Sequence, residues 1–201
     1  MAGPDVSDPI HERMPVSLSL STPYQITKLL GELYCNYYET EVATVRCRFF
    51  NSYGPGEVPG KYRNVIPNFI WAALHDEPLL ITGTGHETRD FVFVDDLVDG
   101  LVRAATTPEA RGCAFNLGRG IETEIGDLAA LVVELTGTKS EIVYCSRRPW
   151  DHCVRRQADI SAARHRLGFE PLVAFGEGLA RTITWFEDEY DRIAASVKGR
   201  A

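Results

Sequence analysis

Residues 21–28 have the sequence STPYQITK, and this stretch predicts the start of a helix. Thr22 is a preferred N-cap residue, Pro23 suits the first helical position, and Gln25 completes a capping box three residues after the cap. Apolar residues then recur at helical spacing as far as Tyr38. The sequence therefore predicts a helix that begins at Thr22 and ends near Tyr38.

Beyond this helix, strand-like and helix-like stretches alternate along the chain. We expect strands at residues 42–50, 79–82, 91–94, 113–117 and 141–145, and helices at residues 65–75, 95–105, 124–135, from 159 and from about 176 to 193. Residues 1–20 and 51–60 contain several prolines or glycines and are expected to be loops. Strands that alternate with helices predict an α/β fold with a largely parallel sheet.

The composition is that of a soluble globular chain or of a large piece of one. The chain has 201 residues, of which 44% are hydrophobic and 24% charged, and a formal net charge of -7. The acidic balance disfavours general binding to nucleic acid, and no apolar run approaches the roughly 18 residues that span a membrane. The first residues lack the basic and apolar segments of a secretory signal.

Cysteine and histidine lack the spacing of a metal or disulfide site. The five cysteines are odd in number and form no C-x-x-C pair, which suits reduced thiols in the cytoplasm. The five histidines show no metal-ligand spacing, and the pair Asp95-Asp96 is better explained by capping of a helix N-terminus. We therefore expect a cytoplasmic protein with no metal, membrane or nucleic-acid partner.

Tyr24 and Lys28 are the first candidates for chemistry. Four residues apart on a helix, they share a face one turn apart. A lysine ammonium beside a phenol favours the ionised form of the phenol, which can then accept a proton from a hydroxyl group. A chain with eight tyrosines can also contain such a pair by chance, so the pair alone does not identify a site.

Further motifs follow the pair in a fixed order. They are RFFNSYGP at 48–55, VIPNFI at 65–70, GTGHETRDF at 83–91 with VDD at 94–96, FNLG at 115–118, RRQADI at 155–160 and LGFEP at 167–171. With the Tyr24–Lys28 pair, this order resembles the extended short-chain dehydrogenases that modify nucleotide sugars, the NAD-dependent epimerase/dehydratase family. The resemblance covers roughly residues 9–190 and is more than a chance match would produce.

The resemblance implies a fold and a division into domains. The expected fold is α/β, the C-terminal part of a doubly wound Rossmann-like sheet together with a smaller substrate-binding domain. Residues 1–63 are expected to be a remnant of the dinucleotide-binding domain that carries the Tyr24 helix. Residues 64–201 are expected to form mostly the nucleotide-sugar-binding domain, with some elements returning to the Rossmann-like sheet.

The resemblance also implies catalytic and cofactor roles. Tyr24 matches the catalytic base, and Lys28 matches its partner, which also holds the nicotinamide ribose of NAD. Asn51 matches an asparagine that contacts the diphosphate of a nucleotide-diphosphate sugar, and its alternative is an Asx-turn at the end of a strand. Asn68 is expected near the same site, with a plain surface position as the alternative.

Two arginines match the diphosphate-binding arginines of the family, Arg89 and Arg156. Guanidinium groups suit this role because they contact phosphate oxygens in a bidentate manner. The alternative for Arg89 is an ion pair with Asp90 or Glu87. Arg155 could exchange roles with Arg156, and the cluster of arginines that contains both could also be only a solvated face.

The chain departs from the family pattern in two places. It contains no Gly-x-x-Gly-x-x-Gly turn for the dinucleotide, and no candidate for the third catalytic hydroxyl group. We therefore expect a chain that lacks the front half of the enzyme and is inactive alone. It would act as a homodimer through the helix 22–38 or with a front-half polypeptide, and the strand 42–50 would be an exposed edge.

The expected function is that of an NAD-dependent nucleotide-sugar epimerase/dehydratase, most like a UDP-hexose 4-epimerase. A decarboxylase or a 4,6-dehydratase begins with the same oxidation and stays open. A non-catalytic remnant that binds nucleotide sugar or a full-length relative is the alternative from another class.

Overall fold

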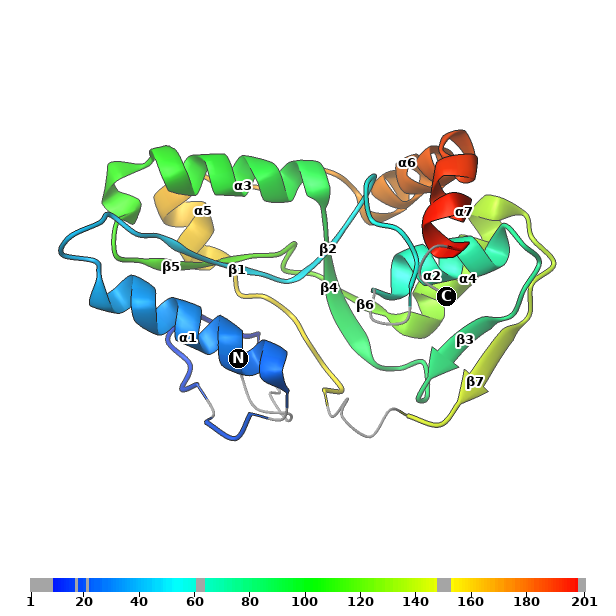
Figure 1. The fold of residues 1–201 in the computed structure, drawn as a ribbon, viewed down its shortest axis with the longest axis horizontal. Helices are drawn as coiled ribbons and strands as arrows, with labels where there is room; N and C mark the ends of the chain where they lie inside the picture. Colours follow the sequence, from blue (N-terminus) through cyan, green and yellow to red (C-terminus); the bar gives the residue numbers. More distant parts are fainter. Residues whose placement is uncertain (1–8, 17, 21, 61–63, 148–152, 199–201) are drawn as a thin grey trace.

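The computed structural model describes residues 9–16, 18–20, 22–60, 64–147 and 153–198, and Figure 1 shows their arrangement. The helices are α1 (Pro23–Tyr37), α2 (Val65–Ala73), α3 (Val94–Thr106), α4 (Ile125–Thr136), α5 (Ser161–Leu167), α6 (Phe175–Asp188) and α7 (Tyr190–Lys198), with a short 3-10 helix, η1, at Pro108–Ala110. The strands are β1 (Arg46–Phe49), β2 (Asn51–Tyr53), β3 (Leu79–Thr82), β4 (Thr88–Phe93), β5 (Ala114–Leu117), β6 (Glu122–Glu124) and β7 (Ile142–Cys145).

Most strand pairs are parallel, as the alternation of strands and helices predicted. β1 pairs with β5, β2 with β4 and β3 with β7 in parallel, and only β4 with β6 is antiparallel within the described residues. In Figure 1 the strands β2, β4 and β6 lie between the β1–β5 pair and the β3–β7 pair. The α/β prediction is therefore confirmed.

Two clusters of buried side chains lie on either side of these middle strands. The larger cluster joins α2, α4 and α6 to the strands, with Ile70, Leu128 and Phe186 fully buried. The smaller cluster joins α3 and α5 to β5 around Phe115 and Phe169. The smaller cluster combines residues from distant parts of the chain. The predicted domain boundary at residue 63 stays a prediction.

The structure corrects several expected boundaries. The strand expected at 42–50 begins only at Arg46, and β2 follows immediately where a loop was expected, because its backbone pairs with β4. Strand β6 was not expected at all. The last helix is two helices, α6 and α7, although Ile193 beyond the break is still buried, so the apolar spacing alone did not reveal the break.

The acidic pair at the start of α3 also differs from the expectation. Phe93, not an aspartate, occupies the N-cap position, and Asp95 and Asp96 lie in the first turn. Asp96 is buried and accepts hydrogen bonds from the amides of Leu172 and Val173, both at 3.0 Å. The pair is therefore structural, but it ties α3 to a neighbouring loop instead of capping it.

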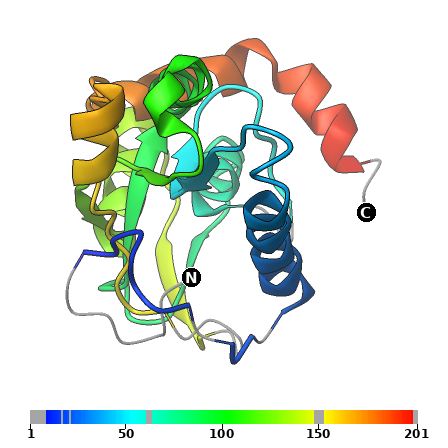
Figure 2. The same ribbon diagram turned by 90° about the vertical axis from the view of Figure 1, so that its left-hand side faces the viewer.

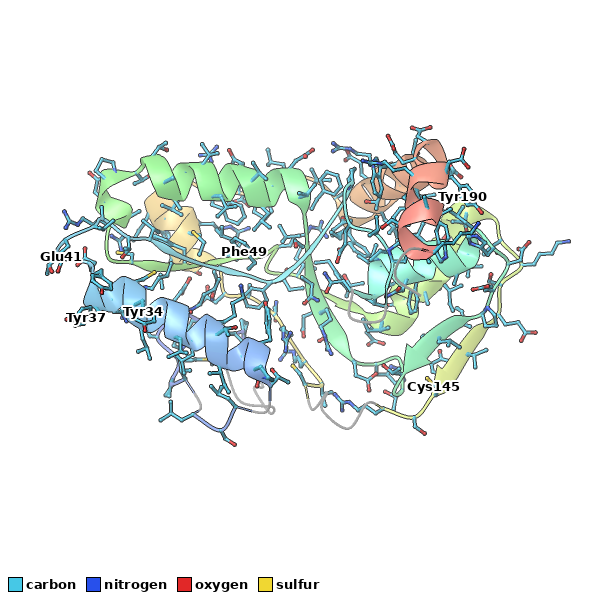
Figure 3. All side chains as sticks on the ribbon, viewed as in Figure 1. Tyr34, Tyr37, Glu41, Phe49, Cys145 and Tyr190 are labelled. Atoms are coloured by element: carbon cyan, nitrogen blue, oxygen red, sulfur yellow. The ribbon has the colours of Figure 1, made fainter. Side chains whose placement is uncertain are left out.

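Helix α1 stands at the side of the β1–β5 pair, which Figure 2 shows from a direction turned by 90°. The predicted capping box is present: Thr22 Oγ1 accepts from the Gln25 amide at 3.3 Å, and Gln25 Oε1 accepts from the Thr22 amide at 3.2 Å. None of its residues is buried. Figure 3 labels Tyr34 and Tyr37 on this helix and Phe49 on the adjacent strand, all of them exposed.

No helix among the described ranges is both long and apolar enough to cross a lipid bilayer.

Candidate active site

Tyr24 lies in the first turn of α1, where the capping box fixes the start of the helix. Its side chain is 69% exposed, so a ligand could reach the phenol. The Nζ atom of Lys28 lies 5.3 Å from the centroid of the Tyr24 ring. The structure thus brings the predicted acid/base pair together on one face of an exposed helix.

Asn51 lies where the chain passes from β1 to β2. The preceding residue, Phe50, continues the parallel pairing by donating its amide to the carbonyl of Leu117, and Asn51 stands opposite Phe91 of β4. Ligands of parallel α/β sheets bind beyond the carboxyl ends of the strands, which is the position that Asn51 occupies at the end of β1. Its side chain makes no hydrogen bond within the described part of the chain, so the Asx-turn alternative is not what the structure contains.

Arg89 lies near the start of β4, opposite Thr123 of β6. Its Nη1 atom donates to the carbonyl oxygen of Thr88 at 2.7 Å. The two acids of the ion-pair alternative are used differently, because the carboxylates of Glu87 and Asp90 accept hydrogen bonds from backbone amides. The strand therefore presents Arg89 while its acidic neighbours are committed to the backbone.

Arg155 and Arg156 differ sharply in their surroundings. Arg155 holds Glu122, with an Nη2–Oε2 distance of 2.7 Å, and this hydrogen bond lowers the pKa of Glu122. Arg155 also donates to Gln157 Oε1 at 3.0 Å. Arg156 is half-buried, and its guanidinium group has no hydrogen bond or ion pair in the residues that the structure describes. Of the two neighbours, Arg156 is the one available to an external anion.

Asn68 makes hydrogen bonds with its own surroundings. Its Oδ1 atom accepts from the amide of Gly60 at 2.9 Å, and its Nδ2 atom donates to the carbonyls of Gly60 at 3.2 Å and Asn64 at 2.9 Å. The side chain thus fastens the loop before α2. Its role as a substrate contact stays a prediction. A ligand would have to donate to the second lone pair of Oδ1 or replace one of these bonds.

The glycine turn before β4 resembles a phosphate cradle in form only. Gly83 and Gly85 have positive φ angles of 114° and 86°, and the amides of Thr84 and Gly85 converge on the carboxylate of Glu87. Burial opposes ionisation of Glu87, yet the amides and the charge of Arg147 together hold its pKa below the ordinary value. This turn already holds an anion of the chain itself, so it does not fit the pyrophosphate of a dinucleotide.

Sequence reasoning missed the residues that fasten the segment before α1. Glu12 Oε1 accepts from the Asn116 amide at 2.7 Å, and Asn116 Nδ2 donates to the carbonyls of Ile10 at 2.7 Å and Asp159 at 3.1 Å. Arg48 donates to the carbonyl of Glu12 at 3.1 Å. These partners are separated by up to 106 positions, so no local pattern could have revealed them.

In the described ranges, no group of three or more His, Cys, Asp and Glu side chains is placed so that it could hold a metal ion.

Comparison with known proteins adds a family match. The model of the NAD dependent epimerase/dehydratase family matches residues 1–118. The UDP-glucose 4-epimerase of Mycolicibacterium smegmatis is 36% identical over 184 residues, which cover 90% of this chain and 57% of that protein. The UDP-N-acetyl-alpha-D-glucosaminuronate decarboxylase of Bacillus cytotoxicus is 34% identical over 171 residues, covering 82% of this chain and 53% of that protein.

A solved structure agrees with both matches. An epimerase of Methanothermobacter thermautotrophicus superimposes with a TM-score of 0.88 at 51% sequence identity, covering 90% of this chain and 55% of that one. The chain therefore spans about half the length of the proteins that it resembles.

Proposed function

Because the chain belongs to the NAD-dependent epimerase/dehydratase family, we propose that it carries the Tyr–Lys helix and the diphosphate-binding arginines of a nucleotide-sugar epimerase. Its substrate in this proposal is a UDP-sugar, as the names of the two relatives suggest for those proteins. The residues in question are Tyr24, Lys28, Asn51, Arg89 and Arg156.

One observation carries the proposal more than any other. Asn51 and Arg156, which come from distant parts of the chain, both keep polar groups without a partner within the described residues. By contrast, Arg155, next to Arg156, and the acids Asp90 and Glu87, near Arg89, are all bonded within the chain. Hydrogen-bonding groups that are half-buried and not used within the chain remain available to a ligand.

The proton chemistry belongs to Tyr24 in this proposal. Its phenol takes the proton of the sugar 4-hydroxyl and later returns a proton to the same oxygen. Lys28, whose Nζ atom lies 5.3 Å from the centroid of the Tyr24 ring, would hold the ribose of the cofactor. A bound NAD would supply the acceptor and donor of the hydride.

This chain fits only one end of NAD. Tyr24 and Lys28 suit the nicotinamide ribose, whereas the glycine turn at Gly83 and Gly85 is filled by Glu87. We propose that a dinucleotide-binding segment outside the described residues completes the catalytic unit. That segment is either part of the same protein or a separate polypeptide.

The class of reaction is proposed as epimerisation. The family profile and the M. smegmatis relative favour it. Decarboxylation is the second candidate, because the B. cytotoxicus relative is almost as similar and the oxidation by Tyr24 is common to both reactions. Supplying UDP-glucose or a UDP-uronic acid to the assembled enzyme would separate the two candidates by product.

A non-catalytic role is the rival proposal. α1 buries none of its residues and exposes Tyr34 by 63%, Tyr37 by 75% and Leu33 by 53%. Such an apolar surface fits an interface with a second copy or with a dinucleotide-binding polypeptide. A chain that associates through α1 without binding a nucleotide would support this rival.

Calorimetric titration of the chain with UDP tests the proposed function. Arg89→Ala and Arg156→Ala should each weaken binding by about 1.5–3 kcal/mol, because each removes hydrogen bonds to a charged phosphate. Arg103→Ala is the matched control, since Arg103 forms a surface pair with Asp99 on α3. Failure of the native chain to bind UDP, or equal affinity in all three variants, would overturn the proposal.

A further inference from the structure

A buried carboxylate links the two backbone segments that carry the candidate diphosphate arginines. Asp90, in β4, has no exposed surface, and its oxygens accept three backbone amides. Oδ1 accepts from Arg119 at 2.7 Å, and Oδ2 accepts from Gly120 and from Ala158, both at 2.9 Å. One side chain therefore links two backbone segments, at Arg119–Gly120 and at Ala158, to β4.

The position of Asp90 along the chain makes this junction relevant to the site. Arg89 immediately precedes Asp90, and Arg156 stands two residues before Ala158. The hydrogen bond between the Ala158 amide and Asp90 is therefore a direct link between the strand that carries Arg89 and the segment that carries Arg156.

The same segment is held from its other side. Ile10 forms a parallel bridge with Ala158, donating its amide to Gln157 at 2.8 Å and accepting from the Asp159 amide at 2.9 Å. The Asp90 link is closely packed as well, because a Cβ atom on Gly118 would lie 2.8 Å from the Cβ of Ala158 and 3.1 Å from Oδ2 of Asp90. The path from β4 to Arg156 thus has little freedom.

The charge of Asp90 works against an anion site. No ion pair neutralises Asp90 in the part of the chain that the structure describes, and burial raises its pKa although the three amides and the Arg119 cation oppose that rise. A negative charge beside two phosphate-binding arginines repels the ligand. If Asp90 acted only through its charge, its removal would strengthen the binding of a diphosphate.

We propose that Asp90 is a positioning residue that fixes the separation of Arg89 and Arg156 so that both can contact one diphosphate. This inference rests on the proposed function. It implies that loss of the Asp90 carboxylate weakens diphosphate binding in spite of the repulsion that is removed.

The substitution Asp90→Asn tests the inference in the full chain. The amide group keeps the size but has one acceptor oxygen where the carboxylate has two, so its NH2 group faces at least one of the amides of Arg119, Gly120 and Ala158, and that hydrogen bond is lost. UDP affinity should fall about tenfold or more, and UMP affinity should fall less because a single phosphate does not need both arginines. In the Arg156→Ala background, Asp90→Asn should add little further loss.

Asp96→Asn is the matched control. Asp96 is also a buried aspartate that accepts two backbone amides, from Leu172 and Val173 in another part of the chain. It should lose comparable stability with unchanged UDP affinity. Unchanged or stronger UDP binding in Asp90→Asn, or an equal loss in both variants, overturns the inference.

A second variant serves if Asp90→Asn does not fold, and a second measurement serves if the native chain does not bind UDP. Gly118→Ala pushes Ala158 away from Asp90 without changing any charge, and should reproduce the selective loss of UDP affinity. If the native chain binds no UDP, the proposed function fails. Hydrogen exchange at the amides of Arg119, Gly120 and Ala158 then tests the positioning role by itself. Protection that is unchanged at all three amides in Asp90→Asn overturns the inference. If Asp90→Asn does not fold, unchanged protection at Ala158 in Gly118→Ala overturns it.

Discussion

Arg48 of β1 donates two parallel hydrogen bonds to the carboxylate of Glu32 in α1, from Nε to Oε1 at 2.8 Å and from Nη2 to Oε2 at 2.7 Å. The third guanidinium nitrogen donates to the carbonyl of Glu12. Because no residue of α1 is fully buried and Leu29 and Cys35 are only half-buried, polar contacts of this kind contribute to placing the Tyr24 helix against the sheet.

The Arg48–Glu32 pair predicts a dependence of stability on pH. Burial opposes ionisation of Glu32, but the hydrogen bond and charge of Arg48 lower its pKa below the ordinary value of 4.5. The pair therefore stabilises the folded chain above about pH 4.5, and this contribution is lost as the pH falls through the lower pKa of the folded state.

Urea unfolding of the native chain and Glu32→Gln between pH 3 and pH 7 checks this dependence. The difference between the two midpoints should be largest near neutral pH and should shrink below about pH 4.5. Glu134→Gln, on the exposed face of α4, is the control and should leave the profile unchanged. A difference that does not vary with pH would contradict the prediction.

The capping box makes a second prediction. Thr22→Ala removes the acceptor for the Gln25 amide and should destabilise the first turn of α1 by about 1 kcal/mol. Hydrogen exchange at Gln25 and Ile26 should become faster. Thr27→Ala, in the same helix, is the control, because alanine favours a helix interior more than threonine does. Equal exchange in both variants would mean that the cap does not hold this turn.

Two glycines in α6 predict opposite effects of the same substitution. A Cβ atom on Gly178 would lie 2.4 Å from the Tyr53 hydroxyl and 2.8 Å from Phe93, whereas a Cβ on Gly176 would meet nothing within 4 Å. Gly178→Ala should therefore destabilise the chain by about 1–3 kcal/mol through overpacking. Gly176→Ala should be neutral or slightly stabilising, and thermal unfolding of the two variants compares them directly.

We predict no detectable epimerase activity for this chain alone. Its 201 residues contain no glycine fingerprint for NAD, so Tyr24 and Lys28 alone would have to hold the cofactor, with no site for its pyrophosphate. Assay of the purified chain with UDP-glucose and NAD, against Tyr24→Phe, measures this. Turnover by the native chain that Tyr24→Phe abolishes would contradict the prediction.

The isolated chain should not be a well-behaved monomer. Strand β1 pairs on one side with β5, and no other described strand pairs with its second edge. Phe49 on this strand and Leu33 on α1 are each 53% exposed. Sedimentation should show dimers or larger species, and Leu33→Glu or Phe49→Lys should reduce them. Val102→Lys on α3 is the exposed apolar control. A monodisperse native monomer with a cooperative thermal transition would contradict this expectation.

Local signals predicted the fold well where they were strong. The cap at Thr22 and the strand at Leu79–Thr82 appear where the sequence placed them. β2 and β6 were missed because three-residue strands have almost no period of their own and exist through pairing with β4. The site residues came from motif order, but the bonds that hold them come from long-range contacts such as that between Asp90 and Ala158.

The unburied helix α1 has a consequence for how substitutions are tolerated. In the isolated chain, a polar residue at the exposed Leu33 removes little internal packing, so selection for folding alone leaves exposed positions of this kind weakly constrained. A saturation library can be selected first for folding and then for growth that requires the assembled protein. Positions that become intolerant only in the second selection outline the surface that a partner covers, without a structure of the complex.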